Sequence, residues 1–369
     1  MTNDNRRSTA GRLLTAVLAA MPLALWAQTP ATITQESDWR RANDAVGALK
    51  RGHADVLRWE QANPVAQDGA PSTALTALPD AGAAIRLAWQ AHPDLVVPLA
   101  RLGADATQAI VEGRWLGLDP SLQRRIEGMA EVLEVATLAR KAWLEAVAAR
   151  QLVQHRRAML DATEAAKDLG ERMVTVGNWS KLQLAPLTLA HASARMDLRR
   201  AQHGADMAQS QLVKALRLTG SASAFALPDQ LPAVPTNLVS PAALQTHAEA
   251  LARQLPGTEA RRNQALLRDA RKTMETAHAL AQDSTEVVLK TREFITEETL
   301  LHYNGMLKSV WDLLGEVRNQ SQAALEAINA QRDFWLADAD LQWVLQGGEP
   351  ANLVSLNGGA ADAPAAAAH

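Results

Sequence analysis

The 369-residue sequence contains no cysteine and few aromatic side chains. Without cysteine there is no disulfide framework, no thiolate chemistry, no cysteine-ligated zinc site and no lipid-anchored N-terminal cysteine. Aromatic residues make up only 4% of the chain, with one Tyr and three Phe against ten Trp. Because large sheets are rich in β-branched and aromatic residues, this composition, dominated by alanine and leucine, favours helices.

Two further absences limit the function. The formal net charge is −3, so the chain lacks the basic footprint of a nucleic-acid-binding protein. It also has no phosphate-binding glycine loop, no nucleophile elbow and no zinc-protease helix motif. We therefore predict a protein that is not an enzyme, uses no cofactor and does not bind nucleic acid.

The N-terminus has the pattern of a secretory signal peptide. Arg6, Arg7 and Arg12 precede an apolar run, Leu13 to Leu25, and a cleavage site fits before Gln28. No other apolar run approaches transmembrane length. We predict that residues 1–27 are a signal peptide, with an uncleaved anchor as the alternative. The mature chain is then exported to the periplasm or the outer membrane.

Proline-rich and glycine-rich stretches divide the rest of the chain. Residues 28–80 are predicted to form an N-terminal amphipathic helix, over 36–62, and a linker. Residues 81–221 and 242–347 form two helical repeats, joined by a proline-rich connector at 222–241. Residues 348–369, rich in Ala and Gly, are predicted to be a disordered tail.

Each repeat contains long proline-free stretches in which apolar residues recur every three or four positions. Helices of this length need lateral packing, because propensity alone does not hold them. The fold is therefore predicted to be all-α, with long antiparallel coiled-coil-like helices in two homologous repeats.

A short motif interrupts the long helical stretch of each repeat. The residues that we expect to form helix turns or to dock a partner are Gly177, Asn178, Trp179 and Ser180 in the first copy and Tyr303, Asn304, Gly305, Ser309 and Asp312 in the second. The serine lies three residues after its glycine in the first copy and four in the second, so the two turns are predicted to differ in geometry. Asp312 either lines a pore constriction or contacts an adaptor, or it only caps its helix.

These duplicated strings, together with the closing segment Ala330 to Leu341, resemble the TolC-like outer-membrane efflux factors over residues 81–347. The resemblance implies an exported homotrimer that forms a helical tunnel and meets a periplasmic adaptor and an inner-membrane pump near the turns. Family members insert two β-strands into each repeat, which would fall near residues 103–125 and 268–285. Neither segment has nine to eleven alternating residues, so we predict the family's helical body without clear β-barrel strands.

Histidine and methionine recur in pairs four residues apart, which places the partners on one helix face. Nine His and nine Met would give roughly half a pair at this spacing by chance. Imidazole and thioether ligands suit copper or silver ions, whereas chance and methionine as core filler explain the pairs without a metal. The candidate residues are His155, Met159, His203, Met207, Met274, His278, His302 and Met306. The sequence thus leaves two functions open: a TolC-like efflux component that docks pump partners, or a soluble periplasmic scaffold or soft-metal-binding protein without transport activity.

Overall fold

The computed structural model describes residues 76–218 and 225–356. The chain divides into two units, Met1–Ser72 and Thr73–His369, and all described residues belong to the second. The predicted signal peptide and N-terminal helix therefore lie outside the described residues, and they stay predictions. Of the predicted linker only residues 76–80 are described, and they contain the short strand β1 (Thr76–Ala77).

Long helices dominate the described unit, which confirms the all-α prediction. The first half contains two long helices, α7 (Met129–Thr175) and α8 (Lys181–Ala215). The second half contains α10 (Gly257–Gln282), α11 (Lys290–Asn304) and α12 (Val310–Leu345), and the π-helix η4 (Asp283–Leu289) joins α10 to α11. At 1.5 Å per residue, the 47 residues of α7 extend over roughly 70 Å. Homology between the two halves stays a prediction.

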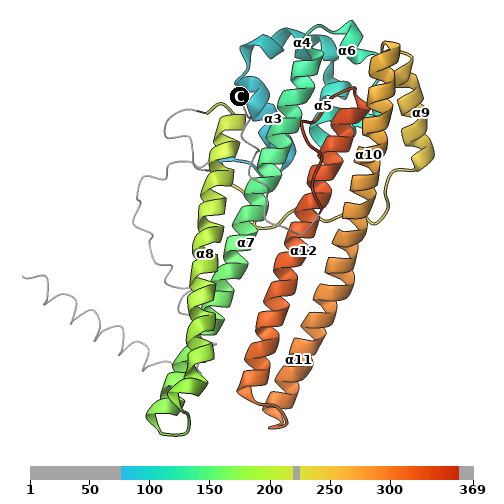
Figure 1. The fold of residues 1–369 in the computed structure, drawn as a ribbon. Coiled ribbons are helices and arrows are strands. Elements are labelled where there is room, and N and C mark those ends of the chain that lie inside the picture. Colours follow the sequence, from blue (N-terminus) through green and yellow to red (C-terminus); the bar gives the residue numbers. More distant parts are fainter. Residues whose placement is uncertain (1–75, 219–224, 357–369) are drawn as a thin grey trace, which may run out of the picture. The chain divides into compact units, whose positions relative to one another are not determined.

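Shorter elements gather at the end of the unit opposite the hairpin turns (Figure 1). They are α3 (Ala81–Gln90), η1 (Pro93–Leu95), α4 (Val96–Leu102), α5 (Ala104–Glu112), η2 (Trp115–Gly117), α6 (Leu122–Arg125) and α9 (Pro241–Ala252). The helical segments between residues 96 and 112 are separated at Gly103, and α5 ends at Gly113; these glycines have φ values of 83° and 76°. This left-handed backbone ends an α-helix and favours glycine.

The two segments without an alternating strand pattern are helical in the structure. Residues 103–125 contain α5, η2 and α6, and residues 268–285 belong to α10 and the start of η4. The strands that the structure describes are β1 (Thr76–Ala77) and β2 (Phe225–Ala226), which pair in parallel.

The long helices lie side by side in the order α8, α7, α12 and α10–α11 (Figure 1). One core packs α3 to α6 against the first half of α7, and a second core packs α9 and α10 against α12. The buried indoles of Trp89, Trp115 and Trp143 donate to carbonyl oxygens, at 3.1, 3.0 and 2.9 Å. These three Trp occupy packing positions.

The segment after α12 differs from its prediction. Residues 348–356 were predicted to belong to a disordered tail, but Leu353, Val354 and Leu356 pack against the second core. An ion pair of 2.9 Å between Arg262 and Glu349 holds the start of the same segment on α10. Three apolar side chains among small residues are thus enough to bury part of this segment.

Candidate docking surface at the hairpin turns

The first hairpin turn joins α7 to α8. Gly177 adopts a left-handed φ of 80°. The amide of Gly177 donates to the carbonyl of Val174 at 3.0 Å, and the amide of Asn178 donates to the carbonyl of Met173 at 2.9 Å. This pair of bonds is the Schellman motif, which satisfies carbonyl groups that the end of a helix leaves unpaired.

The second turn joins α11 to α12 with the same pair of bonds. The amide of Met306 donates to the carbonyl of Tyr303 at 2.9 Å, and the amide of Leu307 donates to the carbonyl of His302 at 2.8 Å. Here the left-handed residue is Met306, with a φ of 59°, while Gly305 has an ordinary φ of −81°. A non-glycine residue in this conformation costs about 1–2 kcal/mol of backbone strain.

The prediction that the two turns differ in geometry is wrong. In both, the left-handed residue lies three positions before the serine that caps the next helix: Gly177 before Ser180, and Met306 before Ser309. The sequence comparison paired Gly177 with Gly305, whereas the equivalent residue in the structure is Met306, one position later. The serine and the polar residue three positions later give the correct register, because together they start a helix.

Both serines form capping boxes. The amide of Gln183 donates to the hydroxyl oxygen of Ser180 at 3.3 Å, and the amide of Ser180 donates to the Gln183 side chain at 2.8 Å. Ser309 and Asp312 make the equivalent bonds at 3.2 and 2.9 Å. Hydrogen bonds from the Ser309 side chain and backbone hold the pKa of the exposed Asp312 below its usual value. Asp312 therefore caps its helix.

A tryptophan pair connects the two turns. Trp179 lies in the hairpin turn between α7 and α8, and Trp311 lies near the N-terminus of α12. Their ring centroids are 4.5 Å apart, with the ring planes inclined by 30°. Stacked aromatic pairs of this kind contribute about 0.5–1.5 kcal/mol beyond their buried area. The two hairpins thus meet at their tips, at one end of the unit (Figure 1).

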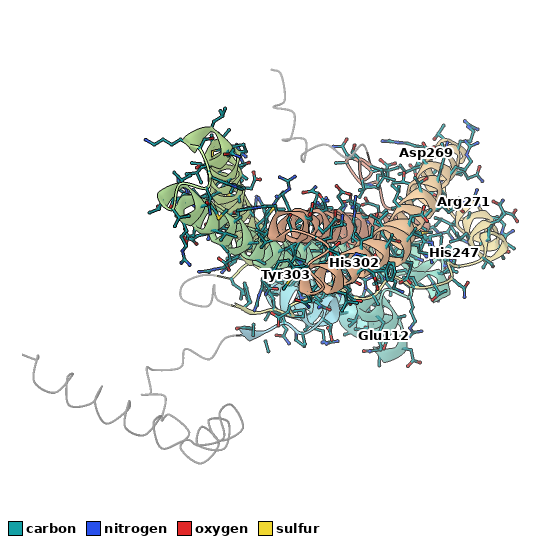
Figure 2. All side chains as sticks on the ribbon, turned by 90° about the horizontal axis from the view of Figure 1, so that it is seen from below. Glu112, His247, Asp269, Arg271, His302 and Tyr303 are labelled. Atoms are coloured by element: carbon teal, nitrogen blue, oxygen red, sulfur yellow. The ribbon has the colours of Figure 1, made fainter. Side chains whose placement is uncertain are left out.

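Three large apolar side chains are exposed at this end. We call Val176, Met306 and Leu307 the turn patch, because all three are largely exposed and Met306 reaches 94%. Figure 2, seen from this end, shows the neighbouring His302 and Tyr303 on the second hairpin. Asn178 and Asn304 are exposed beside the patch. Exposed apolar side chains gathered at one place make this surface a candidate for partner binding.

The histidine–methionine candidates are distributed over the unit. His155 and Met159 lie on α7, His203 and Met207 on α8, Met274 and His278 on α10, and His302 and Met306 at the second turn. Met274 is buried in the second core, and Nε2 of His278 lies 2.7 Å from the carbonyl oxygen of Pro235. Among the described residues, no three His, Cys, Asp or Glu side chains are grouped so that they could hold a metal ion.

Comparisons with known proteins give a fold but no sequence relative. Neither a protein-family model nor a curated protein matches the sequence. Among solved structures, CusC, in a study of its folding and transmembrane channel formation, is similar with a TM-score of 0.51 and 12% identity, over 73% of this chain and 97% of the CusC chain. The described helices have the fold of TolC-family outer membrane channels.

Two other solved structures are similar at lower scores. A membrane protein from Pseudomonas aeruginosa has a TM-score of 0.48 and 12% identity, over 65% of this chain and 74% of its own. The CmeC outer membrane channel of Campylobacter jejuni has a TM-score of 0.45 and 14% identity, over 66% and 68%. Within the described part of this TolC-like body, no helix is both long enough and apolar enough to cross a membrane.

The shared turn geometry gives a matched pair of substitutions. Met306→Gly should raise the free energy of unfolding by about 0.5–1 kcal/mol, because glycine adopts the left-handed conformation without strain. Gly177→Ala should lower it by a similar amount, and a Cβ there would meet no atom within 4 Å, so only the backbone is tested. Urea denaturation of both variants measures the two changes. Changes of the same sign would contradict the common geometry.

Proposed function

We propose that this chain is an exported component of a TolC-like efflux system, in which it acts as a helical scaffold or duct and docks pump partners through the turn patch. The turn patch is the observation that carries the proposal, since both hairpins present their exposed apolar side chains at one end. The fold shared with CusC, a protein that forms a transmembrane channel, supports the same interpretation.

The turn patch has the chemistry of a docking site for another protein. Met306 and Leu307 project from the second turn, and Val176 projects from the first. A flexible methionine side chain adapts to an irregular apolar partner. The left-handed backbone conformation falls on Met306, where it is strained, and not on the neighbouring Gly305. Backbone strain of this kind is typical of ligand-binding positions. We therefore infer that the partner is a periplasmic adaptor with an apolar contact surface.

A photo-crosslinking amino acid in place of Leu307 tests this docking in intact cells. We expect a covalent product that contains a periplasmic adaptor protein, and we expect Met306→Asp in the same chain to reduce its yield at least tenfold, because a carboxylate loses several kcal/mol on burial in an apolar contact. Val97 provides the matched control, since it is exposed and apolar but lies on α4. Equal yields at positions 307 and 97, or products without an adaptor, would contradict the proposal.

The alternative function is a soluble periplasmic scaffold that binds copper or silver ions. Its best support is on α7, where Met159 is buried and burial lowers the pKa of His155, which favours the neutral imidazole that ligates metals. Two measurements separate the functions. An outer-membrane component sediments with outer membranes, whereas a soluble scaffold is released by osmotic shock. Titration of the wild-type chain and of His155→Ala with Cu(I) or Ag(I) tests whether the chain binds these ions and whether His155 is a ligand.

A further inference from the structure

Methionine is the only sulfur-containing residue type in this chain. The sequence has nine Met and no Cys, so no thiol competes for an oxidant. All of the methionines except Met1 and Met21 lie within the described residues. Oxidation of the thioether to a sulfoxide turns a flexible apolar side chain into a polar one, and sulfoxide reductases reverse the change. The methionine that solvent reaches most easily is the one that an oxidant in solution modifies first.

One methionine of the described residues is far more exposed than the others. Met306 is 94% exposed, whereas Met196 and Met207, both on α8, are each 49% exposed. The remaining methionines of the described residues are half-buried or buried, and they are Met129, Met159, Met173 and Met274. A peroxide in solution therefore reaches the sulfur of Met306 more easily than any other sulfur in the described part of the chain.

The second hairpin turn holds the Met306 side chain away from the helices. The φ of Met306 is 59°, and the amides of Met306 and Leu307 donate to carbonyl groups of α11 at 2.9 and 2.8 Å. A side chain inside a helix leans over the preceding turn of the same helix, and the two methionines on α8 are half-covered. Met306 follows the end of α11 in a left-handed conformation, so no such turn covers it. Its exposure is a consequence of the turn geometry.

Met306 is also the most exposed residue of the turn patch. Leu307 is 76% exposed and Val176 is 67% exposed. Tyr303, which Figure 2 shows at the same end, lies three residues before Met306 on the second hairpin. An oxygen added to the sulfur of Met306 would therefore lie within the surface that a docked partner covers.

A sulfoxide is unfavourable in an apolar contact. Its oxygen accepts hydrogen bonds from water while the turn patch is free. An apolar partner excludes that water and offers no donor, and a polar group that is buried without a hydrogen bond weakens the contact. The free chain has no equivalent loss, because Met306 stays in solvent. A change that disfavours only the docked state shifts the equilibrium toward the free chain.

We propose that Met306 is an oxidation site that regulates docking at the turn patch: oxidation by a peroxide releases the partner, and reduction of the sulfoxide restores the contact. A lone pair of the thioether sulfur attacks one oxygen of hydrogen peroxide. The S–O bond forms as the O–O bond breaks, and the departing hydroxide takes up the proton of the transferred oxygen to give water. The sulfur is oxidised and the peroxide is reduced. The inference rests on the proposed function, because it concerns regulation of the same surface.

Oxidation of Met306 should leave the fold intact. The sulfur lies in solvent, and the turn is held by hydrogen bonds between backbone groups, which the sulfoxide oxygen does not replace. Oxidation of Met129 or Met274 would instead place a polar group among the packed apolar side chains of the first or second core. We therefore expect the circular dichroism spectrum and the midpoint of urea denaturation to stay unchanged when Met306 alone is oxidised. A lower midpoint would overturn the proposal, because loss of docking would then follow from unfolding.

Peptide mass spectrometry of the purified full-length chain measures the selectivity. The chain is treated briefly with hydrogen peroxide, and catalase removes the excess. We expect sulfoxide to form at Met306 at least twofold faster than at Met207, the matched control, in line with their exposed fractions of 94% and 49%. Equal rates at positions 306 and 207 would overturn the proposal. No partner protein is present, so this measurement does not depend on docking.

The effect on docking is measured with the photo-crosslinking amino acid at position 307. Washed cell envelopes are treated with peroxide and then catalase before irradiation, and each yield is divided by that of the same chain without peroxide. We expect the adaptor product to fall at least fivefold when Met306 is present and less than twofold in Met306→Leu, because leucine has a similar volume but no thioether. Met207→Leu should respond as the parent chain does. Equal losses for the parent and Met306→Leu would overturn the proposal, since oxidation elsewhere would then be the cause.

A mimic and a repair enzyme complete the test. Met306→Gln places a hydrogen-bond acceptor on a side chain of similar length, so its adaptor yield without peroxide should be as low as that of the oxidised chain. Methionine sulfoxide reductase added after peroxide should restore the yield, and a yield that stays low overturns the proposal. If no adaptor product forms before peroxide, the proposed function fails and its regulation fails with it. If regulation alone fails, an adaptor product forms and peroxide leaves it unchanged.

Discussion

Replacing Lys141 by methionine should lower the free energy of unfolding by about 3 kcal/mol. Nζ of Lys141, on α7, lies 2.7 Å from Oδ1 of Asp340, on α12, and the Asp340 side chain is 1% exposed. The other oxygen, Oδ2, has no hydrogen-bond partner in the described structure. Removing the ammonium group leaves an unpaired buried carboxylate. Lys141 itself is 26% exposed, which allows water to replace part of the lost contact and places the expected cost at the low end of the usual range.

The double variant Lys141→Met with Asp340→Leu is the control for this prediction. Replacing a buried pair by apolar residues of similar volume is often neutral or stabilising, so the double variant should be at least as stable as wild type in urea denaturation. If Lys141→Met alone is as stable as wild type at neutral pH, the pair is not buried in solution and the packing of α7 on α12 is wrong.

The pH dependence of the same variant gives an independent check. Burial raises the pKa of Asp340, and Lys141 acts against this increase. A carboxyl group with a raised pKa in the folded state favours folding as pH falls through that value, because the folded state then binds more protons than the unfolded state. Without Lys141 the pKa rises further. The stability difference between Lys141→Met and wild type should therefore shrink between pH 7 and about pH 5.

Much of the helical architecture could be predicted from periodicity and helix signals. The proline-free stretches became α7, α10, α11 and α12, and the turns formed at the two interrupting motifs. Gly315 lies inside α12 without ending the helix. A single glycine costs only about 1 kcal/mol in a helix interior, and the packing of a long helix exceeds that cost.

The misses concern properties that the packing of distant residues determines. The register of the second turn was missed because glycine is the usual left-handed residue, and here Met306 takes that conformation one position after Gly305. The order of residues 348–356 depends on contacts with α10, some eighty residues earlier in the chain. The Trp179–Trp311 pair joins side chains far apart in sequence. Periodicity reports the faces of one helix and carries no information on which helix covers each face.

Replacing Trp143 by alanine should lower the free energy of unfolding by about 3–5 kcal/mol. The ring is 1% exposed in the first core, and its Nε1 donates to the carbonyl of Leu78 at 2.9 Å. The substitution leaves a large cavity where α7 packs against the first core. It also leaves the buried carbonyl oxygen of Leu78 without its hydrogen-bond donor. That bond also fixes the segment next to β1, and β1 pairs with β2 at the start of the connector between the halves. The loss should thus extend beyond the core and expose residues near Phe225 to hydrogen exchange.

Trp143→Phe separates packing from hydrogen bonding. Phenylalanine keeps most of the buried ring but lacks the N–H group, so the expected cost is about 1–3 kcal/mol, close to that of leaving one buried carbonyl unpaired. Urea denaturation followed by circular dichroism measures both variants, and hydrogen exchange locates the change. Equal losses for Phe and Ala would mean that the bond to Leu78 dominates. A loss below 1 kcal/mol for Trp143→Ala would show that α3 to α6 do not pack on α7 as described, and the small helices could not then close the end opposite the hairpin turns.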